Sequence, residues 1–303
     1  MSRDSLNVLI TGGTGLIGQA LIPALENRGH RVSVLTRRPD RYPDKANRPR
    51  LFSALGDIPD DHPVDAVINL AGARIVGPRW TERRKQVLRD SRIGLTKKTV
   101  QWMSRRPTPP AVLISGSAVG YYGDRHDDIL REDQPCGEDF GALLCRDWEA
   151  GGLSAEQLGI RVAVIRTGLV LSGDGGMLPP MLRSFGLGLG ARIGSGRQWM
   201  SWIHIDDQVG AVCHLLSCST SRGAYNLTAP EAITNTGFSD CLARVLRRPR
   251  LFAVPAAALR LVLGEAAILV LGGQRTTSDK LREEGFEFRY PHLEGAFRAI
   301  AGH

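Results

Sequence analysis

The chain of 303 residues is long enough to bury a large core, in one two-lobed domain or two closely joined ones. Its net charge of +8 comes mostly from arginines in short, scattered runs without interleaved aromatic residues, so a nucleic-acid-binding face is not expected. Five cysteines without a CxxC pair favour reduced thiols in a cytoplasmic protein over a metal site. The sequence predicts neither a targeting peptide nor a membrane-spanning segment.

Short apolar runs alternate with helix-length segments through the first half of the chain. Runs rich in Val, Ile and Leu are typical of strands in a parallel sheet that is covered on both faces. A run near residue 51 is followed too closely by the next one for a crossover helix to fit between them. The pattern therefore predicts a doubly wound α/β (Rossmann) fold, with strands at 7–11, 31–36, 66–70, 111–115 and 161–166 and helices at 16–28, 81–104 and 139–158.

The second half has a different pattern, because residues 172–203 are rich in glycine and proline without a regular period. A helix is expected at 206–216, with Asp206 or Asp207 as its N-cap, and a strand at 223–228. We predict a dinucleotide-binding domain over 1–171, to which 204–228 returns. Residues 172–203 and 229–303 are expected to form a smaller, mostly helical substrate lobe, and a substrate would bind between the two parts.

The glycine-rich segment "LITGGTGLIGQALIPAL" at 9–25 lies between a predicted strand and a predicted helix. Gly12, Gly15 and Gly18 have the spacing that permits a tight turn, a close approach to a pyrophosphate, and close packing of helix on strand. The alternative is a purely structural turn, which this position between strand and helix makes less attractive. The segment indicates a dinucleotide site.

The second strand ends in "VLTRRP", where an acidic residue would bind the ribose of NAD. Arg37 and Arg38 stand there instead, and guanidinium groups suit a 2′-phosphate. NADP(H) is therefore the expected cofactor. The alternative is a solvated pair of arginines after a strand.

Several motifs occur together in an order that resembles a known superfamily. "TGGTGLIG" followed by "NLAG" (69–72), "SGSAVGYYG" (115–123), "REDQP" (131–135) and "WIHIDD" (202–207) resembles the extended short-chain dehydrogenase/reductases of the NAD-dependent epimerase/dehydratase type. With "GLGARIGSGRQ" and "VLGGQR", the chain is similar to an atypical subgroup. Members of that subgroup are epimerase family proteins of unknown substrate, some of them described as cell-division inhibitor-like.

The resemblance implies a role for each matching position. Ser117, at the end of the fifth strand, would hydrogen-bond a substrate hydroxyl or carbonyl. Ligands in such sheets bind at the carboxyl ends of the strands, which agrees with that position. The implied cofactor contacts are Thr11, Gly12, Gly13, Thr14, Gly15, Leu16, Ile17, Gly18, Thr36, Arg37, Arg38, Leu70, Ala71 and Gly72.

The sequence departs from the superfamily at its catalytic pair. The usual tyrosine and the lysine four residues later correspond to Gly141 and Cys145, and the usual asparagine corresponds to Arg92. Glycine cannot transfer a proton, and a thiol does not supply the fixed positive charge of lysine. Cys145 either takes part in the reaction or, as is more usual for a cysteine on a helix, is a small buried apolar residue.

Tyr121 and Tyr122 are candidates to replace the missing acid, because they follow Ser117 closely in a glycine-bounded loop. Arg92 and an oxidised nicotinamide nearby would favour the phenolate form. The alternative is that the two rings only line the pocket. In the smaller lobe, Arg192 and Arg197 are candidates to bind the diphosphate of a nucleotide-linked substrate.

We therefore expect an NADP(H)-dependent oxidoreductase or epimerase that acts on a small polar substrate, with nucleotide sugars as one candidate class. Ser117, Tyr121, Tyr122, Arg92 and Cys145 are the candidate catalytic residues. The alternative is a non-catalytic NADPH sensor or regulatory protein, for example in cell division. The expected partner is a small molecule, and a monomer and a homodimer both remain open.

Overall fold

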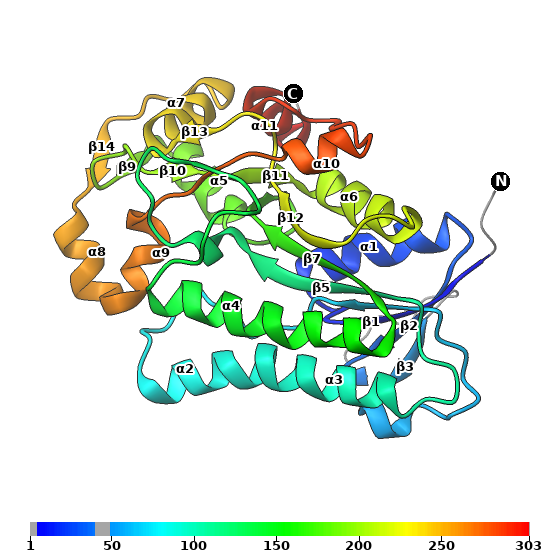
Figure 1. The fold of residues 1–303 in the computed structure, drawn as a ribbon. Helices are drawn as coiled ribbons and strands as arrows, with labels where there is room; N and C mark the ends of the chain where they lie inside the picture. Colours follow the sequence, from blue (N-terminus) through cyan, green and yellow to red (C-terminus); the bar gives the residue numbers. More distant parts are fainter. Residues whose placement is uncertain (1–4, 40–48, 303) are drawn as a thin grey trace.

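Seven parallel strands form one central sheet in the computed structural model, which describes residues 5–39 and 49–302 (Figure 1). The strand order is β12-β7-β5-β4-β1-β2-β3, so the order reverses between β1 and β4. Ligands of doubly wound sheets bind at such a reversal, and the predicted Rossmann fold is confirmed. The strands are β1 Asn7–Thr11, β2 Arg31–Leu35, β3 Arg50–Phe52, β4 Ala66–Asn69, β5 Val112–Ala118, β7 Arg161–Thr167 and β12 Gly223–Leu227.

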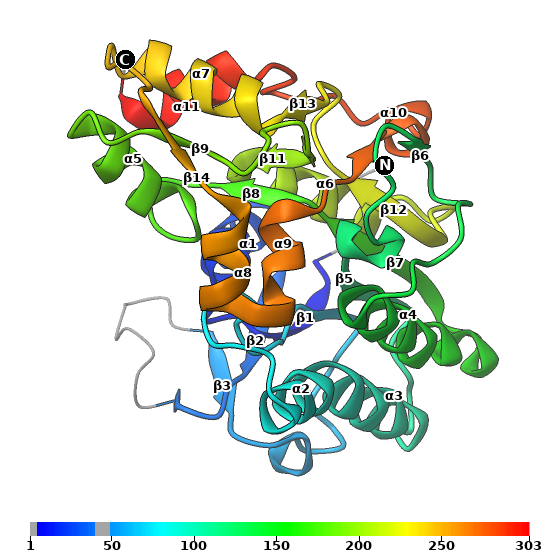
Figure 2. The same cartoon turned by 90° about the vertical axis from the view of Figure 1, so that its left-hand side faces the viewer.

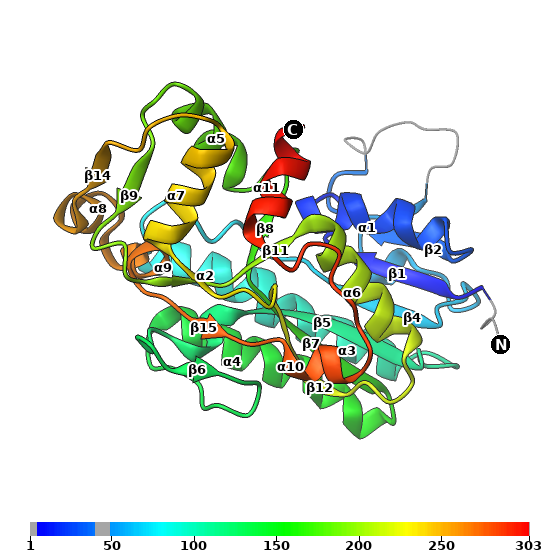
Figure 3. The same ribbon diagram turned by 90° about the horizontal axis from the view of Figure 1, so that it is seen from above.

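Helices cover both faces of the sheet. On one face, α1 (Leu16–Glu26) and α6 (Ile205–Ser217) lie side by side (Figures 1 and 3). On the other face lie α2 (Glu82–Arg89), α3 (Leu95–Ser104) and α4 (Phe140–Leu153). Successive strand residues point to opposite faces, so Val8 and Ile10 join the core under α1 whereas Leu9 packs toward α3. Both sets must be apolar, which explains the continuous apolar runs in the sequence.

The predicted helix over 81–104 is interrupted by one wide turn. Between α2 and α3 the chain makes a π-helical turn at Asp90–Gly94. Thr81 caps the start of α2 by accepting a hydrogen bond from the backbone N–H of Arg84 at 3.2 Å. Turns of this type often occur at functional sites, and this one carries Arg92.

A second apolar core lies beyond the sheet, around Trp202, Phe238 and Phe297, in the part of the chain drawn above the sheet in Figure 2. Its chain segments come mainly from the stretches that we expected to form the smaller lobe. The elements of these stretches are β8 Leu169–Leu171, α5 Leu178–Gly186, β9 Ala191–Ile193, β10 Trp199–Met200, β11 Trp202–His204, β13 Ile233–Thr234, α7 Asn235–Val245, β14 Phe252–Val254, α8 Ala256–Leu263, α9 Ile268–Leu271 and α11 Leu293–Ala301. Of these, α8 and α9 pack instead in a separate apolar cluster with Trp80, Leu88 and Leu144.

Part of the last segment packs on the sheet and not on this second core. Leu281 of α10 (Asp279–Glu283) is fully buried in the core under α1 and α6, and Phe286 and Phe288 pack against the same core. Strand β15 (Arg275–Thr276) also pairs with β6 (Ile129–Leu130), which follows β5 in the chain. Near residue 275 the chain therefore returns from the smaller lobe to the sheet.

The cap of α6 differs from the sequence prediction. His204 is the N-cap, because its Nδ1 accepts a hydrogen bond from the N–H of Asp206 at 3.1 Å. The prediction of Asp206 or Asp207 is therefore wrong. Asp207 instead accepts hydrogen bonds from the N–H groups of Arg289 and Tyr290, at 2.7 and 2.9 Å. A carboxylate is the stronger acceptor for two converging N–H groups, and this one holds the C-terminal segment against α6.

Candidate functional site

Backbone atoms leave no room for a side chain at Gly12 and Gly18, two of the three spaced glycines of the motif between β1 and α1. Gly12 has a φ of +76°, and a Cβ there would lie 2.7 Å from the carbonyl carbon of Leu70. A Cβ on Gly18 would lie 2.5 Å from the carbonyl oxygen of Gly12. Gly15, the exposed N-cap of α1, meets only that oxygen, at 3.3 Å, and no side chain caps the helix. The first N–H groups of α1 are thus left to a ligand or to water.

The remaining predicted cofactor residues surround this turn. Thr14 is exposed, Leu16 and Ile17 are half-buried, and Gly13 is packed against Val34. After β2, the buried Thr36 accepts a hydrogen bond from the N–H of Arg38 at 3.3 Å. Arg37 and Arg38 are both exposed just beyond the end of β2. In folds of this type, residues at this position face the adenosine ribose of a dinucleotide whose pyrophosphate lies at the glycine turn.

Thr11 is the first residue in a chain of hydrogen bonds that runs through the protein interior. Its hydroxyl donates to Oδ1 of Asn69 at 2.6 Å, and Nδ2 of Asn69 donates to Oγ1 of Thr96 at 2.7 Å. The indole Nε1 of Trp148 donates to the same Thr96 oxygen at 3.0 Å. Oγ1 of Thr11 also accepts the N–H of Ala71 at 3.3 Å. The chain joins β1 and β4 to the helices beneath them and holds the Leu70–Gly72 loop beside the glycine turn.

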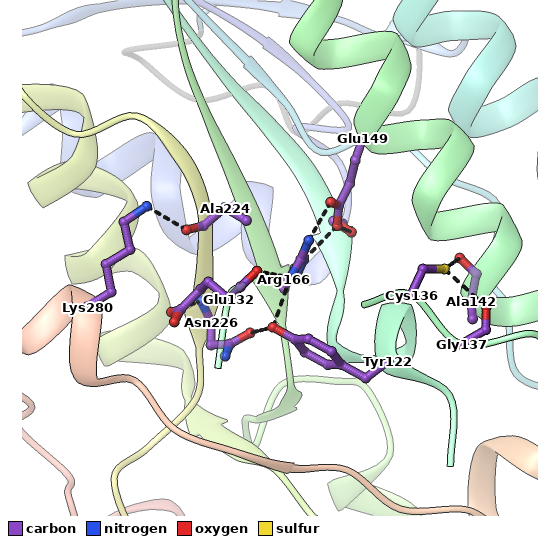
Figure 4. A network of polar contacts seen from close by, with 11 residues as sticks. Tyr122, Glu132, Cys136, Gly137, Ala142, Glu149, Arg166, Ala224, Asn226 and Lys280 are labelled. Atoms are coloured by element: carbon purple, nitrogen blue, oxygen red, sulfur yellow. Dashed lines mark hydrogen bonds and ion pairs between the residues drawn. The ribbon is translucent and has the colours of Figure 1, made fainter. Parts of the chain in front are cut away.

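Ser117 is tied to a buried ion pair that the sequence reasoning missed. Figure 4 shows the two members of that pair, Glu149 and Arg166. Its hydroxyl donates to Oε1 of Glu149 at 2.6 Å. The carboxylate of Glu149 also accepts Nε and Nη2 of Arg166, each at 2.9 Å, and both side chains are buried. Burial alone would lower the pKa of Arg166, but the hydrogen bonds and charge of Glu149 raise it above its usual range. With its proton directed to Glu149, Ser117 can only accept a hydrogen bond from a ligand.

The two tyrosines have different surroundings. Tyr122 is fully buried; its hydroxyl donates to Oδ1 of Asn226 at 2.7 Å and accepts from Nη1 of Arg166 at 2.9 Å (Figure 4). Tyr121 is half-buried, and its ring centroid lies 3.6 Å from Cζ of Arg166. Only Tyr121 therefore has a hydroxyl that is not held on both sides by buried partners.

The expected stabilisation of a phenolate is not found. Burial raises the pKa of Tyr121, and the charge of Arg166 only partly offsets it. Burial likewise raises the pKa of Tyr122 to about 12, although Arg166 and Asn226 act in the opposite direction. Both phenols are therefore protonated near neutral pH, because desolvation of the anion outweighs the nearby cation.

Cys145 and Arg92 lie close together at the wall between α4 and the π turn. Cys145 is buried, and burial raises the pKa of its thiol to about 12, with Glu149 acting in the same direction and Arg92 opposing it. The guanidinium of Arg92 stacks over Trp148, 5.3 Å from Cζ to the ring centroid. A Cβ on Gly72 would lie 3.0 Å from the same Cζ. The missing tyrosine position, Gly141, is buried and packs near Trp80.

The two arginines of the smaller lobe are not joined to this group by any contact in residues 5–39 and 49–302. Nη1 of Arg192 donates to the carbonyl of Gly194 at 2.6 Å, and Arg197 is exposed on the following loop. That loop is anchored near the tyrosines, because Nε1 of Trp199 donates to Asp127 at 2.8 Å. Within the described residues, no cluster of His, Cys, Asp or Glu could hold a metal ion, and no helix is long and apolar enough to cross a membrane.

Comparison with known proteins assigns the chain to a family. The model of the NAD dependent epimerase/dehydratase family matches residues 8–228, which is most of the chain. The chain belongs to this family. Residues 254–300 match a further model, a domain of unknown function designated DUF1731.

Relatives within the epimerase/dehydratase family match over nearly the whole chain. The chain is 38% identical to the chloroplastic SDR39U1 homolog of Arabidopsis thaliana, an epimerase family protein, over 98% of this chain and 87% of the relative. It is 41% identical to epimerase family protein Mb2239 of Mycobacterium bovis, over 93% of each chain. The crystal structure of human epimerase family protein SDR39U1 with NADPH has a TM-score of 0.89 and 32% identity, over 98% of this chain and 100% of that one.

In this epimerase/dehydratase family member, the residues that sequence reasoning missed are Arg166, Glu132 and Asn226, and Glu149 was used only as a sequence marker. Glu132 accepts the N–H of Asn226 at 2.9 Å through its carboxylate, and its backbone carbonyl accepts from Arg166 at 2.9 Å. One signal could have found Arg166: it is a charged residue near the end of the apolar strand "RVAVIRT". A buried charge needs a partner, which would have directed attention to Glu149.

The environment of the cysteines predicts their order of reaction. Cys145 should resist iodoacetamide in the folded protein near neutral pH, because the thiolate is the reactive form and its pKa is raised to about 12. Cys218 should react first, because hydrogen bonds from Ser221 and Thr220 lower the pKa of this half-buried thiol. Peptide mass spectrometry after brief alkylation measures both. Labelling of Cys145 ahead of Cys218 would contradict the assignment of Cys145 as a buried, unreactive residue.

Proposed function

We propose that this protein is an NADP(H)-dependent oxidoreductase or epimerase that acts on a carbonyl or hydroxyl carbon of a small polar substrate, with nucleotide sugars as one candidate class. The observation that carries the proposal is the glycine turn. Gly12 and Gly18 leave no space for a side chain, and the exposed Gly15 opens the N-terminus of α1 toward the reversal between β1 and β4. The NADPH in the human relative supports the choice of cofactor.

Different residues around the turn would contact different parts of the cofactor. Backbone N–H groups of Leu16 and Ile17 would hold the pyrophosphate, and Arg37 with Arg38 would hold the 2′-phosphate. Leu70, Ala71 and Gly72 would line the ribose side. When bound, NADPH would supply a hydride. Ser117, at the end of β5, would accept a hydrogen bond from the hydroxyl of an alcohol substrate or of the alcohol that reduction forms, because its own proton is directed to Glu149.

Tyr121 would act as the proton donor in place of the missing tyrosine. Its raised pKa keeps the phenol protonated near neutral pH, which suits donation to a carbonyl oxygen during reduction and does not suit proton removal from an alcohol. The protein would therefore work most readily in the reductive direction. Tyr122 would be a positioning residue, because its hydroxyl is buried between Arg166 and Asn226.

A second candidate function is a sensor that binds NADPH without turnover. The specific observation that favours it is the occupation of the usual acid/base pair by Gly141 and the unreactive Cys145. The apolar core of the smaller lobe and the anchored loop at Trp199 favour the enzyme, because a sensor has no need of a substrate wall. Incubating the protein with NADPH and a metabolite extract separates the two. NADPH oxidation coupled to loss of one metabolite supports the enzyme, and tight binding without any oxidation supports the sensor.

The cofactor preference can be measured directly. NADPH should bind more tightly than NADH, and Arg37→Ala should remove most of that preference. Charge-assisted hydrogen bonds to a phosphate correspond to a loss of about 10- to 100-fold in NADPH affinity. Isothermal titration of both cofactors gives the ratio. The control is Arg31→Ala, an exposed arginine at the opposite end of β2, which should leave both affinities unchanged. Equal affinities in the unsubstituted protein would contradict the phosphate assignment.

A further inference from the structure

Two arginines lie near one another beside the candidate site, and the charge of one acts on the other. Arg84 lies on α2 and Arg92 on the π turn that follows it. The loop after β4 covers both: the N–H of Ala73 donates to Oγ of Ser91 at 3.0 Å, and Nη2 of Arg84 donates to the carbonyl of Arg74. The guanidinium of Arg92 lies beside the exposed Gly72, where a Cβ would be 3.0 Å from Cζ of Arg92, and that of Arg84 lies at the end of the same loop.

Each of these arginines carries a buried nitrogen without a hydrogen-bond partner. The atoms are Nη1 of Arg92 and Nε of Arg84. Within residues 5–39 and 49–302, no carboxylate forms an ion pair with either side chain. Leaving a buried charged donor unpaired costs more stability than a typical hydrogen bond contributes, so such atoms in a native protein call for an explanation. A ligand that accepts hydrogen bonds explains both.

The electrostatics point to the sign of that ligand. Burial lowers the pKa of Arg92, and the like charge of Arg84 lowers it further, while Cys145 acts in the opposite direction. Glu149, the nearest acid of the site described above, is neutralised by its two hydrogen bonds with Arg166. The wall beside Ser117 therefore has an excess of positive charge, and an anion would relieve the repulsion between the arginines.

We propose that Arg92, supported by Arg84, binds an oxyanion of the substrate, a carboxylate or a phosphoryl group, next to the reacting carbonyl carbon. The inference rests on the proposed function and narrows its substrate class to anionic carbonyl compounds, such as 2-oxo acids or phosphorylated carbonyl compounds, and away from uncharged sugars. The planar guanidinium can pair with either group through two parallel hydrogen bonds. Stacking on Trp148 holds the plane of the Arg92 guanidinium in one orientation.

Binding of unreactive anions tests the proposal without an assay for turnover. The NADPH-bound protein is titrated by calorimetry with oxamate, which carries a carboxylate beside an amide carbonyl, and separately with inorganic phosphate, at constant ionic strength. At least one of them should bind to the unsubstituted protein. Arg92→Gln should weaken that binding about 10- to 100-fold, and Arg92→Lys less so because it keeps the charge without the fork. A preference for oxamate assigns a carboxylate, and a preference for phosphate assigns a phosphoryl group.

The control is Arg83→Gln, an exposed arginine one position from Arg84, which should bind both anions like the unsubstituted protein. Melting temperatures check that every variant is folded. Three results would overturn the inference alone: no binding of either anion to the NADPH complex, unchanged binding in Arg92→Gln, or loss of NADPH affinity in Arg92→Gln, which would place Arg92 in the cofactor site. Failure of the unsubstituted protein to bind NADPH would overturn the proposed function together with the inference.

Discussion

Replacing Tyr121 by Phe should lower kcat for NADPH-dependent reduction by about 10²- to 10⁴-fold, because proton donation by a positioned group contributes that much. Phe keeps the ring that stacks on Arg166, whose Cζ lies 3.6 Å from the ring centroid, so the pocket wall survives and only the proton is lost. The affinity for NADPH should stay unchanged. Stopped-flow absorbance of NADPH, with the substrate identified from the metabolite extract, measures the rate.

The matched control is Tyr122→Phe. Its hydroxyl joins Arg166 to Asn226 in the interior, so its removal should lower stability by about 1–3 kcal/mol and change kcat per folded molecule by less than about tenfold. Equal rates in Tyr121→Phe and the unsubstituted protein would return Tyr121 to the role of pocket wall. A large loss of kcat confined to Tyr122→Phe would exchange the roles of the two tyrosines.

The pH profile of reduction tests the same assignment. The pKa of Tyr121 is raised by burial, so its phenol is protonated below that pKa and ionises only above it. Reduction should therefore be independent of pH through the neutral range and should fall only at pH values above about 10, the ordinary value for tyrosine. A fall in rate between neutral pH and that value would contradict Tyr121 as the donor.

Replacing Arg166 by Met should destabilise the fold by about 3–5 kcal/mol, because it leaves the carboxylate of Glu149 buried and without its cation. For a chain of this size the corresponding fall in melting temperature is about 5–8 °C. Arg166 also holds the hydroxyl of Tyr122 and the carbonyl of Glu132, so both lose a donor. Thermal unfolding followed by circular dichroism measures the change.

Two further variants separate the ion pair from general effects of losing a charge. Combining Arg166→Met with Glu149→Leu removes both charges and should recover a large part of the lost stability, since apolar pairs of similar volume often replace buried ion pairs without loss. Arg146→Met, on the same helix as Glu149 but exposed and paired with Asp147, should leave the melting temperature unchanged. If the double variant unfolds at a lower temperature than Arg166→Met alone, the unpaired charge is not the cause.

Much of the fold could be predicted because its signals are local. Strand β1 was predicted over the residues it occupies, and the helices at α1 and α4 begin at or within one residue of the predicted start. The short link between β3 and β4 contains only a single turn of 3-10 helix at Leu55–Asp57, as its length required. Apolar periodicity and glycine spacing report on the backbone within a few turns, where distance along the chain and distance in space agree.

The candidate site was predicted only where a single segment forms it. The glycine turn and the exposed Arg37 and Arg38 lie within one strand–turn–helix–strand unit, so their arrangement follows from the local pattern. The surroundings of Tyr121 were predicted incorrectly, because the cation near its ring is Arg166 and the dominant effect on its pKa is burial. The spacing of residues along the chain shows neither which cation lies near the ring nor how deeply the ring is buried.

The sequence by itself determined the elements, the dinucleotide turn and the absence of the usual tyrosine and lysine from α4. Only the tertiary structure decided which groups surround the positions that they would occupy. It brought Tyr122 to Asn226 across 104 positions and joined Glu149 to both Ser117 and Arg166, and it left a nitrogen of Arg92 buried without a partner. The reason is physical: hydrogen bonding and desolvation depend on which strands become neighbours in the sheet, and strand order is set by packing of the whole chain.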